Sequence, residues 1–484
     1  MIISPAWAGK RYAVLGLARS GAATVRALLA ASARVQAWDA DEARRTSVLP
    51  ELTRGGGPRA QGVVEGQAAQ PPSSTTPHHH SADAERSPSP SKLGEDLVVA
   101  PLDDLAGFDA LVVSPGVPLN THPIAAAARA AGVPIIGDIE LFAEARASLP
   151  PHKVVGITGT NGKSTTTALV HHILQTAGVP SLMGGNIGLP ILAQEPLPNG
   201  GVYVLELSSY QLDLTRTLDC DVAVLLNITP DHLDRYDGFE AYAASKERLF
   251  EMQSPGHAAI FSSGDDEQTR AIASRHPSAS WDRGRPDELP IARDPSARWG
   301  DDVRQEDWLA LQGPHNLQNA IAASEAAERL GVSNTAIIEG LRTFTGLPHR
   351  MQRVATIDGV AYVNDSKATN PESAAPALAA FPRIHWIVGG RAKSDDLEAC
   401  APYFGNVAAA YTIGEAGPLF FEVLKGRVPV VENAGTIAAA VAHAAAAARP
   451  GDTVLLSPAC ASFDQFRDYE ERGVAFRTLV EKLA

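Results

Sequence analysis

The sequence predicts an α/β protein of three domains built on parallel sheets, and three observations support this prediction. The chain has 484 residues, more than one hydrophobic core usually covers. A short apolar strand, a glycine-containing turn and an alanine-rich helix follow one another in three places: "RYAVLGLARSGAATVRALLAA", "KVVGITGTNGKSTTTALV" and "RIHWIVGGRAKSDDLEACAPYF". Strands that alternate with helices form parallel sheets. Proline-containing stretches, "ASLPPHKVV" and "FTGLPHRMQRVA", separate these units and predict domains over 1–150, 151–345 and 346–484.

Composition and charge exclude several classes of protein. A hydrophobic content of 45% with 20% charged residues is typical of a soluble globular protein. The net charge of −14 argues against nucleic acid or an anionic membrane as a partner. Three scattered cysteines form no disulfide framework and favour a reducing compartment. Neither a signal peptide nor an apolar run of about 18 residues is present, so we expect a cytoplasmic protein, with a monomer as the default.

One segment of the first domain departs from the strand–helix alternation. Residues 54–96 contain "GGGPRAQG" and "QPPSSTTPHHHSADAERSPSPS" and few side chains that would fill a core. This composition predicts a disordered surface insertion. The run His78–His80 raises the alternative of a metal site, but no carboxylate or cysteine accompanies it at ligand spacing. A solvated loop is therefore the favoured interpretation.

The first strand–turn–helix unit, "VLGLARSG", is typical of a Rossmann-like domain. Asp39 ends the next strand, "RVQAWD", and follows Gly16 by 23 positions, which is close to the spacing of a dinucleotide-binding fold. An NAD-dependent oxidoreductase is therefore an alternative of a different class. Ala18 stands at the middle glycine of that fingerprint, where a Cβ would obstruct a pyrophosphate. Ser20 and Gly21, at the expected helix start, could instead hold a single phosphate.

The second unit carries the strongest motif of the chain. Between the strand "VVGIT" and a helix that begins "KSTTTALV", the loop Gly159-Thr160-Asn161-Gly162 presents backbone N–H groups at a helix N-terminus, which favours phosphate. Lys163 would reach the terminal phosphates, and Ser164 would ligate Mg²⁺. The strict motif has glycine where this chain has Ile157, so the match is to the shorter form "GTNGKST". A P-loop ATPase-like central domain is predicted, with an ordinary glycine-rich turn as the weaker alternative.

A nucleotide loop needs a metal-binding acid on a neighbouring strand. Glu206 ends the apolar strand "GVYVLE", and Asn227, Asp231 and His232 follow the next strand, "DVAVLL". Ligand sites of α/β proteins form at these strand ends. A buried glutamate is costly unless it meets a cation or a donor, so Glu206 is predicted to bind Mg²⁺. A capping or ion-paired acid is the alternative.

At this point the sequence resembles the Mur ligase family, the ATP-dependent amino-acid ligases of bacterial cell-wall synthesis. The motifs that carry the resemblance occur in the family's order and cover the whole chain except the insertion: "VVSPGVP", "TGTNGKST", "GGNIG", "LELSSYQL", "NITPDHLDR", "GPHNLQNAIAA", "LPHR", "VNDSKATNP" and "LLSPACASFDQF". The first and the last two resemble the branch that adds D-glutamate. The resemblance implies domains for UDP, ATP and the amino acid, the outer two Rossmann-like.

The implied reaction joins D-glutamate to UDP-N-acetylmuramoyl-L-alanine, with ATP and Mg²⁺ as cofactors. A carboxylate is a poor electrophile, and phosphorylation turns it into an acyl phosphate that an amine attacks. The protein's main tasks are then to neutralise charge and to position the reactants. By matching motif, the catalytic residues are Lys163, Glu206, His232 and Lys246. Ser164, Glu206 and His232 would hold Mg²⁺, together with Lys246 if its amine is carbamoylated; a solvated helix lysine is the alternative for Lys246.

The resemblance also implies the remaining contacts. The nucleotide would meet the phosphate loop and Lys163, Ser164, Thr165, Asn316, Asn319, Arg350 and Asp365. The UDP substrate would meet Arg19, Ser20, Asp39, Ser114 and Asn186. D-Glutamate would meet Thr369, Lys393, Ser462 and Phe463, with Lys367 nearer the phosphates. The alternative for "CASFDQF" is a helix start; we expect Phe463 and Phe466 to pack in the core and Ser462 to be exposed.

Three nearer alternatives remain open. A diaminopimelate- or lysine-adding ligase of the same family usually carries a "DNPR"-type motif, which this chain lacks. A folylpolyglutamate synthase-like ligase shares the phosphate loop, but "SPACASFDQF" favours the D-glutamate branch. A nucleotide-gated binding protein is the alternative outside the enzymes. Release of ADP that depends on D-glutamate would distinguish the ligase from it.

Overall fold

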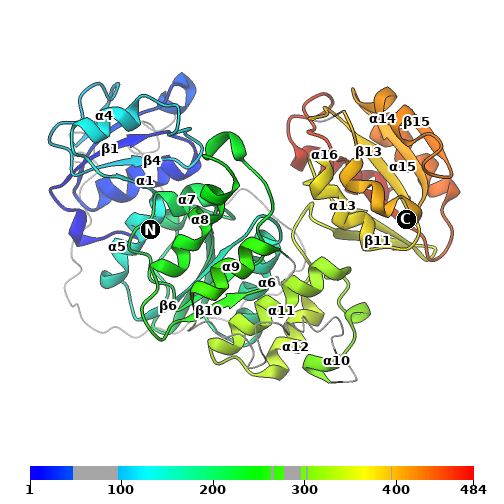
Figure 1. The fold of residues 1–484 in the computed structure, drawn as a ribbon, viewed down its shortest axis with the longest axis horizontal. Coiled ribbons are helices and arrows are strands. Elements are labelled where there is room, and N and C mark those ends of the chain that lie inside the picture. The colour runs from blue at the N-terminus through cyan, green and yellow to red at the C-terminus, as the bar shows by residue number, and fades with distance from the viewer. Residues whose placement is uncertain (47–95, 263–265, 277–295, 301–302, 394, 484) are drawn as a thin grey trace, which may run out of the picture. The chain divides into compact units, whose positions relative to one another are not determined.

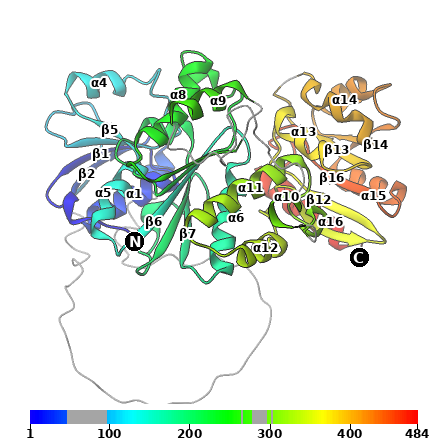
Figure 2. The same ribbon diagram turned by 60° about the horizontal axis from the view of Figure 1, so that its bottom comes forward.

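The computed structural model of the chain describes residues 1–46, 96–262, 266–276, 296–300, 303–393 and 395–483. The chain divides into two compact units, Met1–Leu149 with Pro190–Pro196, and Pro150–Leu189 with Leu197–Ala484. Figures 1 and 2 show the helices and sheets of each unit. The α/β class is confirmed. The predicted insertion over 54–96, with its three histidines, lies outside the described residues except for Asp96. The boundaries at 150 and 345 stay a prediction.

The first unit contains a parallel sheet in the order β3-β2-β1-β4-β5. Its strands are β1 (Arg11–Leu15), β2 (Arg34–Trp38), β3 (Leu97–Val99), β4 (Ala110–Val113) and β5 (Ile135–Ile136). Its helices are α1 (Arg19–Ala30), α4 (Ile124–Ala130) and α5 (Asp138–Ala145), with the 3-10 turns η1 (Pro5–Trp7), η2 (Arg146–Ser148) and η3 (Ile191–Ala193). The carboxyl ends of β1, β2 and β4 therefore lie at one edge of the sheet.

The second unit begins with a parallel sheet in the order β10-β9-β6-β8-β7. Its strands are β6 (His152–Thr158), β7 (Ser181–Gly185), β8 (Gly201–Glu206), β9 (Val222–Leu225) and β10 (Ala258–Phe261). Its helices are α6 (Lys163–Thr176), α7 (Ser209–Asp213), α8 (Phe239–Glu251), α9 (Glu267–Arg275), α10 (Ser296–Trp299), α11 (Pro314–Arg329) and α12 (Asn334–Thr343). Its 3-10 turns are η4 (Leu233–Arg235) and η5 (Gln305–Asp307). Because β6 lies between β8 and β9, the loop after β6 is flanked by both neighbouring strand ends.

A third sheet follows in the order β11-β12-β16-β13-β14-β15. Its strands are β11 (Gln352–Ile357), β12 (Val360–Asn364), β13 (Ile384–Gly389), β14 (Val407–Ile413), β15 (Val431–Gly435) and β16 (Thr453–Leu456). Its helices are α13 (Pro371–Ala379), α14 (Gly417–Leu424), α15 (Ile437–Ala447) and α16 (Tyr469–Glu481), with the 3-10 segment η6 (Glu398–Asn406). This sheet is mixed, because β11 pairs with β12 antiparallel, whereas the other strand pairs are parallel. Asp358 and Gly359 join them with φ of 49° and 76°, as a tight hairpin turn requires.

Alternate strand residues build two cores on the third sheet. Trp386 and Val388 face a core that includes Leu378 of α13 and Phe420 of α14. Ile387 faces the opposite core, with side chains from α15 and α16. This period of two is the signature of a sheet covered on both faces. Loops at the carboxyl ends of the strands are thus held on a rigid base.

One structural observation concerns whether a helix could cross a membrane. Among the residues that the structure describes, none of the helices combines the length and the apolar character needed to cross a bilayer.

Candidate active site

The turn after β1 is organised by Asp39. Gly16 has a φ of 90°, and the N–H groups of Leu17 and Asp41 donate to the Asp39 carboxylate at 2.7 and 2.9 Å. Ser114 Oγ donates to the Gly16 carbonyl at 2.9 Å. Burial opposes ionisation of Asp39, but these N–H donors and Arg44 more than offset it, so the pKa of Asp39 is lowered. Both oxygens of the Asp39 carboxylate already accept hydrogen bonds from the backbone of this turn. An NAD-dependent oxidoreductase would need this acid to bind a ribose, so the geometry weakens that alternative.

The predicted UDP-contacting residues fall in two places. Arg19 and Ser20 lie in the first turn of α1, exposed and half-buried respectively, beside the turn that Asp39 and Ser114 support. Asn186 belongs to the other compact unit and follows β7. The roles of all five residues in binding remain predictions.

Asp138 is a buried acid that the sequence analysis missed. It is the first residue of α5, is 4% exposed, and lines a cavity of about 10 Å³ with Ser20, Thr24 and Ser114. Its Oδ1 has no hydrogen-bond partner within the described part of the chain. Burial raises the pKa of Asp138 from 3.8 to about 6, against the opposing effect of nearby backbone N–H groups. The carboxyl group is therefore easier to protonate in the folded state than in the unfolded state.

This shift predicts that the first unit loses stability as the pH rises. A raised carboxyl pKa contributes stability below the unfolded value of 3.8, and that contribution is lost as pH rises through about 6. Asp138→Asn cannot ionise, so the variant should gain on the natural protein by up to about 3 kcal/mol in free energy of unfolding between pH 4 and pH 7.5. Denaturant unfolding of both proteins at the two pH values measures this difference. If the difference in free energy of unfolding between the two proteins did not change with pH, the raised pKa of Asp138 would be contradicted.

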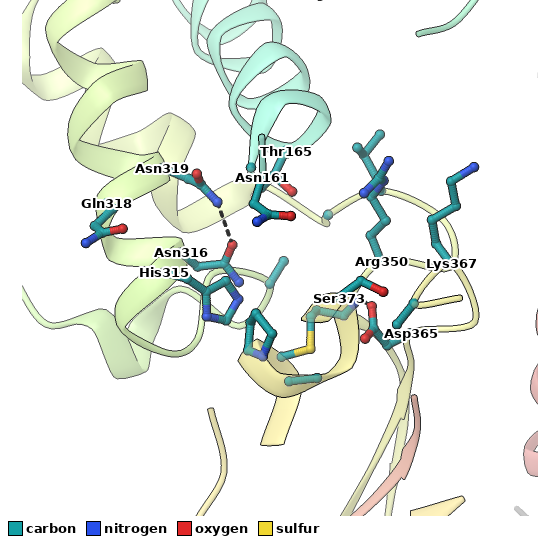
Figure 3. A pocket seen from close by; sticks show the side chains of 18 of the residues that line it. Asn161, Thr165, His315, Asn316, Gln318, Asn319, Arg350, Asp365, Lys367 and Ser373 are labelled. Carbon is teal, nitrogen blue, oxygen red and sulfur yellow. Dashed lines mark hydrogen bonds between the residues drawn. The ribbon is translucent and has the colours of Figure 1, made fainter. Parts of the chain in front are cut away.

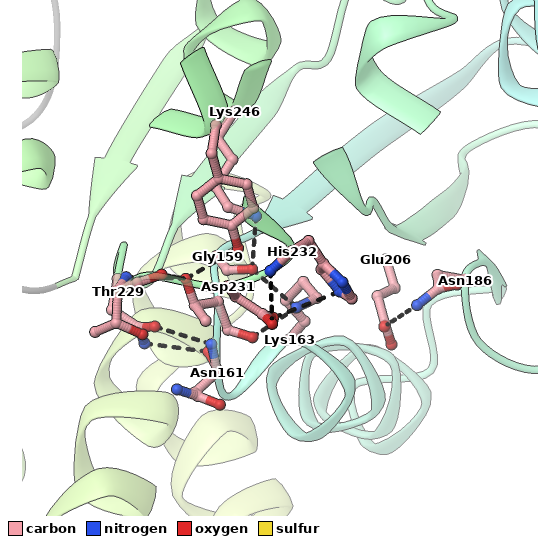
Figure 4. A network of polar contacts seen from close by, with 12 residues as sticks. Gly159, Asn161, Lys163, Asn186, Glu206, Thr229, Asp231, His232 and Lys246 are labelled. Carbon is pink, nitrogen blue, oxygen red and sulfur yellow. Dashed lines mark hydrogen bonds and ion pairs between the residues drawn. The ribbon is translucent and has the colours of Figure 1, made fainter. Parts of the chain in front are cut away.

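The phosphate loop connects β6 to α6 and is shaped by two glycines. Gly159 and Gly162 have φ of 147° and 85°, and a Cβ at Gly162 would lie 2.3 Å from Asn319 Oδ1. Asn227, after β9, holds the loop: its side chain accepts from Asn161 N–H at 2.9 Å and donates to Asn161 C=O at 3.1 Å. Its carbonyl also accepts from Thr160 N–H at 2.8 Å. Figure 4 labels Gly159, Asn161 and Lys163 in this loop. The sequence places Asn227 at a strand end, but it does not show that Asn227 contacts the backbone of Asn161.

Two lysines share one carbonyl of this loop. Lys163 Nζ donates to Gly159 O at 2.8 Å and to Thr160 O at 2.7 Å, and Lys246 Nζ donates to Gly159 O at 2.9 Å (Figure 4). Lys246 is 1% exposed and lies 4.5 Å from the centre of the Tyr242 ring. Burial, and then the charge of Lys163, lower the pKa of Lys246 well below its usual value. A solvated helix lysine, the alternative for Lys246, is therefore wrong, because its helix α8 packs against the sheet.

Glu206 offers an oxygen to a cation. It is 2% exposed at the end of β8, and its Oε1 accepts from Asn186 Nδ2 at 2.9 Å. Its Oε2 is buried without a hydrogen-bond partner among the residues described. Ser164 lies in the first turn of α6 and is buried. A hard divalent ion fits such an oxygen, since Mg²⁺ is usually held by one or two carboxylates and substrate phosphates.

His232 stands on a strained backbone. It adopts a φ of 53°, and its Nε2 lies 3.5 Å from Asp231 Oδ2. About half of its side chain is exposed. In the described part of the chain, no three histidine, cysteine, aspartate or glutamate side chains form a preassembled metal cluster. Contacts of a metal with His232 and Lys246 stay a prediction.

A cavity of about 140 Å³ lies beside the loop within the second unit (Figure 3). Asn161, Gly162 and Thr165 line it from the phosphate loop and the start of α6. Its other lining residues include His315, Asn316, Asn319, Arg350, Met351, Asp365 and Lys367. The structure thus brings together the predicted nucleotide residues from three separate stretches of sequence.

The asparagines of α11 form a buried polar chain in this cavity. Thr166 Oγ1 donates to Asn319 Oδ1 at 3.2 Å, and Asn319 Nδ2 donates to Asn316 Oδ1 at 3.1 Å (Figure 3 shows the latter bond). Asn316 Nδ2 then donates to Gln312 O at 3.0 Å. Burial lowers the pKa of His315 to about 4, so this ring is neutral at pH 7. Asn316 and Asn319, three residues apart, thus share one helix face; their contact with the nucleotide remains a prediction.

The far wall of the cavity carries charged groups. Asp365 Oδ2 accepts from Ser457 Oγ at 2.8 Å, and Oδ1 accepts from Met351 N–H at 3.2 Å. Burial raises the pKa of Asp365 to about 7, although both donors oppose the rise. Lys367 Nζ lies 3.7 Å from the centre of the Tyr469 ring. Arg350 also lines the wall. Fixed donors and cations here suit a polyanionic ligand.

The predicted amino-acid residues follow three neighbouring parallel strands. Thr369 follows β12, Lys393 follows β13 and Ser462 follows β16, so their loops lie at one edge of the sheet. The expectation for "CASFDQF" is wrong: Ser462 is 2% exposed, whereas Phe463 is 64% exposed. Backbone hydrogen bonds between Arg391 and Ala461, at 2.9 and 3.0 Å, turn Ser462 inward and Phe463 outward.

The helix-start alternative for that segment is also wrong. The helix α16 begins only at Tyr469, where the Asp468 side chain caps it by accepting from Glu471 N–H at 2.8 Å. Phe466 is partly buried against the core of the third sheet, as expected. Lys393 is exposed.

The site combines a phosphate loop, a buried acid on the adjacent strand and a polar cavity, which is the arrangement of a nucleotide-dependent enzyme. Comparison with known proteins specifies the class. The profile of the Mur ligase middle domain matches residues 157–327, and that of the Mur ligase glutamate ligase domain matches residues 349–460. The chain belongs to the Mur ligase family, whose members are ATP-dependent ligases.

Full-length relatives carry one name. The UDP-N-acetylmuramoylalanine–D-glutamate ligase of Novosphingobium aromaticivorans is 57% identical over 100% of this chain and 97% of its own. That of Sphingopyxis alaskensis is 55% identical and that of Zymomonas mobilis 49% identical, each over 100% of both chains. Among solved structures, UDP-N-acetylmuramate-alanine ligase from Thermotoga maritima has a TM-score of 0.52 at 15% identity, over 98% of this chain and 100% of its own. This last likeness concerns the fold alone.

Proposed function

We propose that this protein is an ATP-dependent ligase that joins D-glutamate to UDP-N-acetylmuramoyl-L-alanine in peptidoglycan biosynthesis, releasing ADP and phosphate. The observation that carries the proposal is the match of 49–57% identity, over the whole chain, to relatives named for this reaction. The phosphate loop, Glu206 and the cavity supply the chemistry that the reaction needs. We place the reaction in the cytoplasm, where the cofactor ATP is available, and expect a monomer.

In the first half-reaction, the alanyl carboxylate attacks the γ-phosphorus of ATP, and the bond between that phosphorus and the β–γ bridging oxygen breaks. Two anions must approach each other, so the protein's contribution is positive charge and N–H donors. Lys163 would leave the Gly159 and Thr160 carbonyls for the phosphates, and Arg350 would face them across the cavity. Bound Mg²⁺ would supply further charge neutralisation, held by Ser164 and Glu206.

In the second half-reaction, the amine of D-glutamate attacks the acyl phosphate, and phosphate leaves as the peptide bond forms. The incoming amino acid carries two carboxylates, which need fixed donors. Thr369, Lys393 and Ser462 offer two hydroxyls and one ammonium from adjacent loops. The backbone hydrogen bonds between Arg391 and Ala461 hold two of these loops in register. Closely spaced loops on a rigid sheet can orient the amine toward the acyl carbon.

The proposal predicts a strict dependence on one amino acid. With ATP, Mg²⁺ and UDP-N-acetylmuramoyl-L-alanine, phosphate release should require D-glutamate and should be at least about a hundredfold slower with L-glutamate, D-aspartate, L-lysine or meso-diaminopimelate. The measurement is continuous phosphate detection with amino acids supplied singly. Equal or faster release with diaminopimelate or lysine would assign the chain to another branch of the family. Nicotinamide binding without ATP binding would refute the ligase altogether.

A further inference from the structure

Arg472 is a buried cation outside the residues assigned so far. It lies on α16 and is 1% exposed. Its Nε donates to Ser366 Oγ at 3.0 Å, its Nη2 to Ser366 O at 2.8 Å and its Nη1 to Cys460 O at 3.0 Å. Ser366 follows β12 and Cys460 follows β16. One planar group therefore joins two loops that are far apart in sequence.

The first of these loops is held to α16 by several contacts. Ser366 Oγ donates to Tyr469 O at 2.8 Å, and Asn364 Nδ2 donates to Gly473 O at 3.0 Å. Lys367 rests on the Tyr469 ring. From α16, Arg472 also reaches the second loop, through Cys460 O. The first loop continues to Thr369.

A third loop lies beside the second loop and the same guanidinium. A Cβ at Gly390 would lie 2.3 Å from Ala461 O and 3.2 Å from Arg472 Nη1, so it is the close approach to the Ala461 carbonyl that requires glycine. The φ of 133° at Gly390 also favours glycine. The next residue, Arg391, is hydrogen-bonded to Ala461 through both backbone groups. This third loop leads to Lys393.

The contacts of Arg472 are unusual for a residue that serves stability alone. Across the described residues, it forms no ion pair with a carboxylate, and the acceptors of its hydrogen bonds are two carbonyls and one hydroxyl. Burial lowers the pKa of Arg472 to about 10, while Asp464 and Asp365 oppose the decrease. A buried cation without a partner carboxylate is expensive, and an apolar side chain would fill the space at lower cost. Placement of the loops is a benefit that an apolar side chain would not provide.

We propose that Arg472 is the positioning residue of the amino-acid site. Its guanidinium joins the loops after β12 and β16 directly, and the loop after β13 is tied to them through the hydrogen bonds between Arg391 and Ala461. These three loops carry Thr369, Ser462 and Lys393. Arg472 does not touch the amino acid itself. The inference rests on the proposed function, because it assumes that the three residues bind the dicarboxylate.

The test compares steady-state kinetics of Arg472→Met and Arg472→Lys in the full chain. Methionine keeps the volume and removes every donor, so KM for D-glutamate should rise at least tenfold, while KM for ATP changes threefold or less. Lysine keeps the charge but has no planar fork and can bridge fewer acceptors. The KM of Arg472→Lys for D-glutamate should therefore lie between that of the natural protein and that of Arg472→Met. Arg477→Met is the matched control, since Arg477 lies on the same helix but is 47% exposed.

The outcomes separate positioning from a general loss of structure. A selective rise in KM for D-glutamate with partial recovery in Arg472→Lys supports the proposal. An unchanged KM for D-glutamate in folded Arg472→Met overturns it. A fall in kcat together with a rise in KM for every substrate also overturns it. If Arg472→Met does not fold, Ser366→Ala removes the Nε acceptor and should show the same selective rise. Natural protein that releases no phosphate with D-glutamate would refute the proposed function; active natural protein with an unaffected variant would refute only this inference.

Discussion

Replacing Lys163 by alanine is expected to lower kcat by about a thousandfold while the fold is retained. The ammonium group would face the terminal phosphates, where negative charge must be neutralised for a carboxylate to accept a phosphoryl group. Losing one such charge typically costs a factor of about 10²–10³ or more. Among the described residues, the hydrogen bonds of Lys163 go to the Gly159 and Thr160 carbonyls of its own loop, so its removal breaks no hydrogen bond to a distant segment there. Phosphate release under saturating substrates measures the effect.

The control for this prediction is Lys153→Ala. Lys153 is exposed on β6, the strand that leads into the loop, and lies away from the cavity of the nucleotide site. This variant should keep kcat within about twofold, as surface changes usually do. Circular dichroism and thermal unfolding should match the natural protein for both variants. A rate near normal in Lys163→Ala would mean that the phosphate loop is misassigned.

The second large effect is expected at Lys246. Two ammonium groups on one carbonyl oxygen repel each other, and burial makes the repulsion stronger. The neutral amine of Lys246 is therefore favoured, and a neutral amine can add CO₂, forming an N–C bond with loss of a proton. Lys246→Met keeps the volume but cannot form a carbamate. We expect kcat to fall by about 10²–10³, the cost of losing one charged group that acts in the transition state.

The carbamate itself can be observed directly. Natural protein equilibrated with ¹³C-bicarbonate should show a carbamate carbon resonance that disappears in Lys246→Met. Lys246→Arg keeps a cation but cannot add CO₂, so it should be as inactive as Lys246→Met if the carbamate matters. Full activity in Lys246→Arg, or an unchanged resonance in Lys246→Met, would contradict the assignment.

Local patterns identified the elements that surround the nucleotide site. The loop "GTNGKST" follows an apolar strand and opens a helix in the structure, and Glu206 ends the neighbouring strand as expected. These features depend on residues close together in the sequence, where glycine conformation and helix-end dipoles act over one or two turns. The three-residue spacing of Asn316 and Asn319 likewise places both on one helix face, as the structure shows. The Asp358-Gly359 turn was also readable, because this dipeptide favours a hairpin, but it was overlooked.

Long-range packing explains what local patterns missed. The inward turn of Ser462 follows from hydrogen bonds between residues 391 and 461, which no local pattern predicts. Asp138 is a buried acid at a helix start, and helix starts usually expose acids, so its burial depends on the whole first unit. In the sequence, Arg472 is one of two arginines on a helix that looks exposed. Its role emerges only when three strand ends lie side by side.

By itself, the sequence determined the α/β class, the phosphate loop and the ligase family, because these depend on short motifs and their order along the chain. Only the tertiary structure decided which side chains share one environment: the two lysines on Gly159, the buried carboxylate of Glu206 beside Asn186 and the guanidinium behind the amino-acid loops. The physical reason is that burial and charge proximity depend on residues distant in sequence, and parallel sheets bring such residues together at one edge.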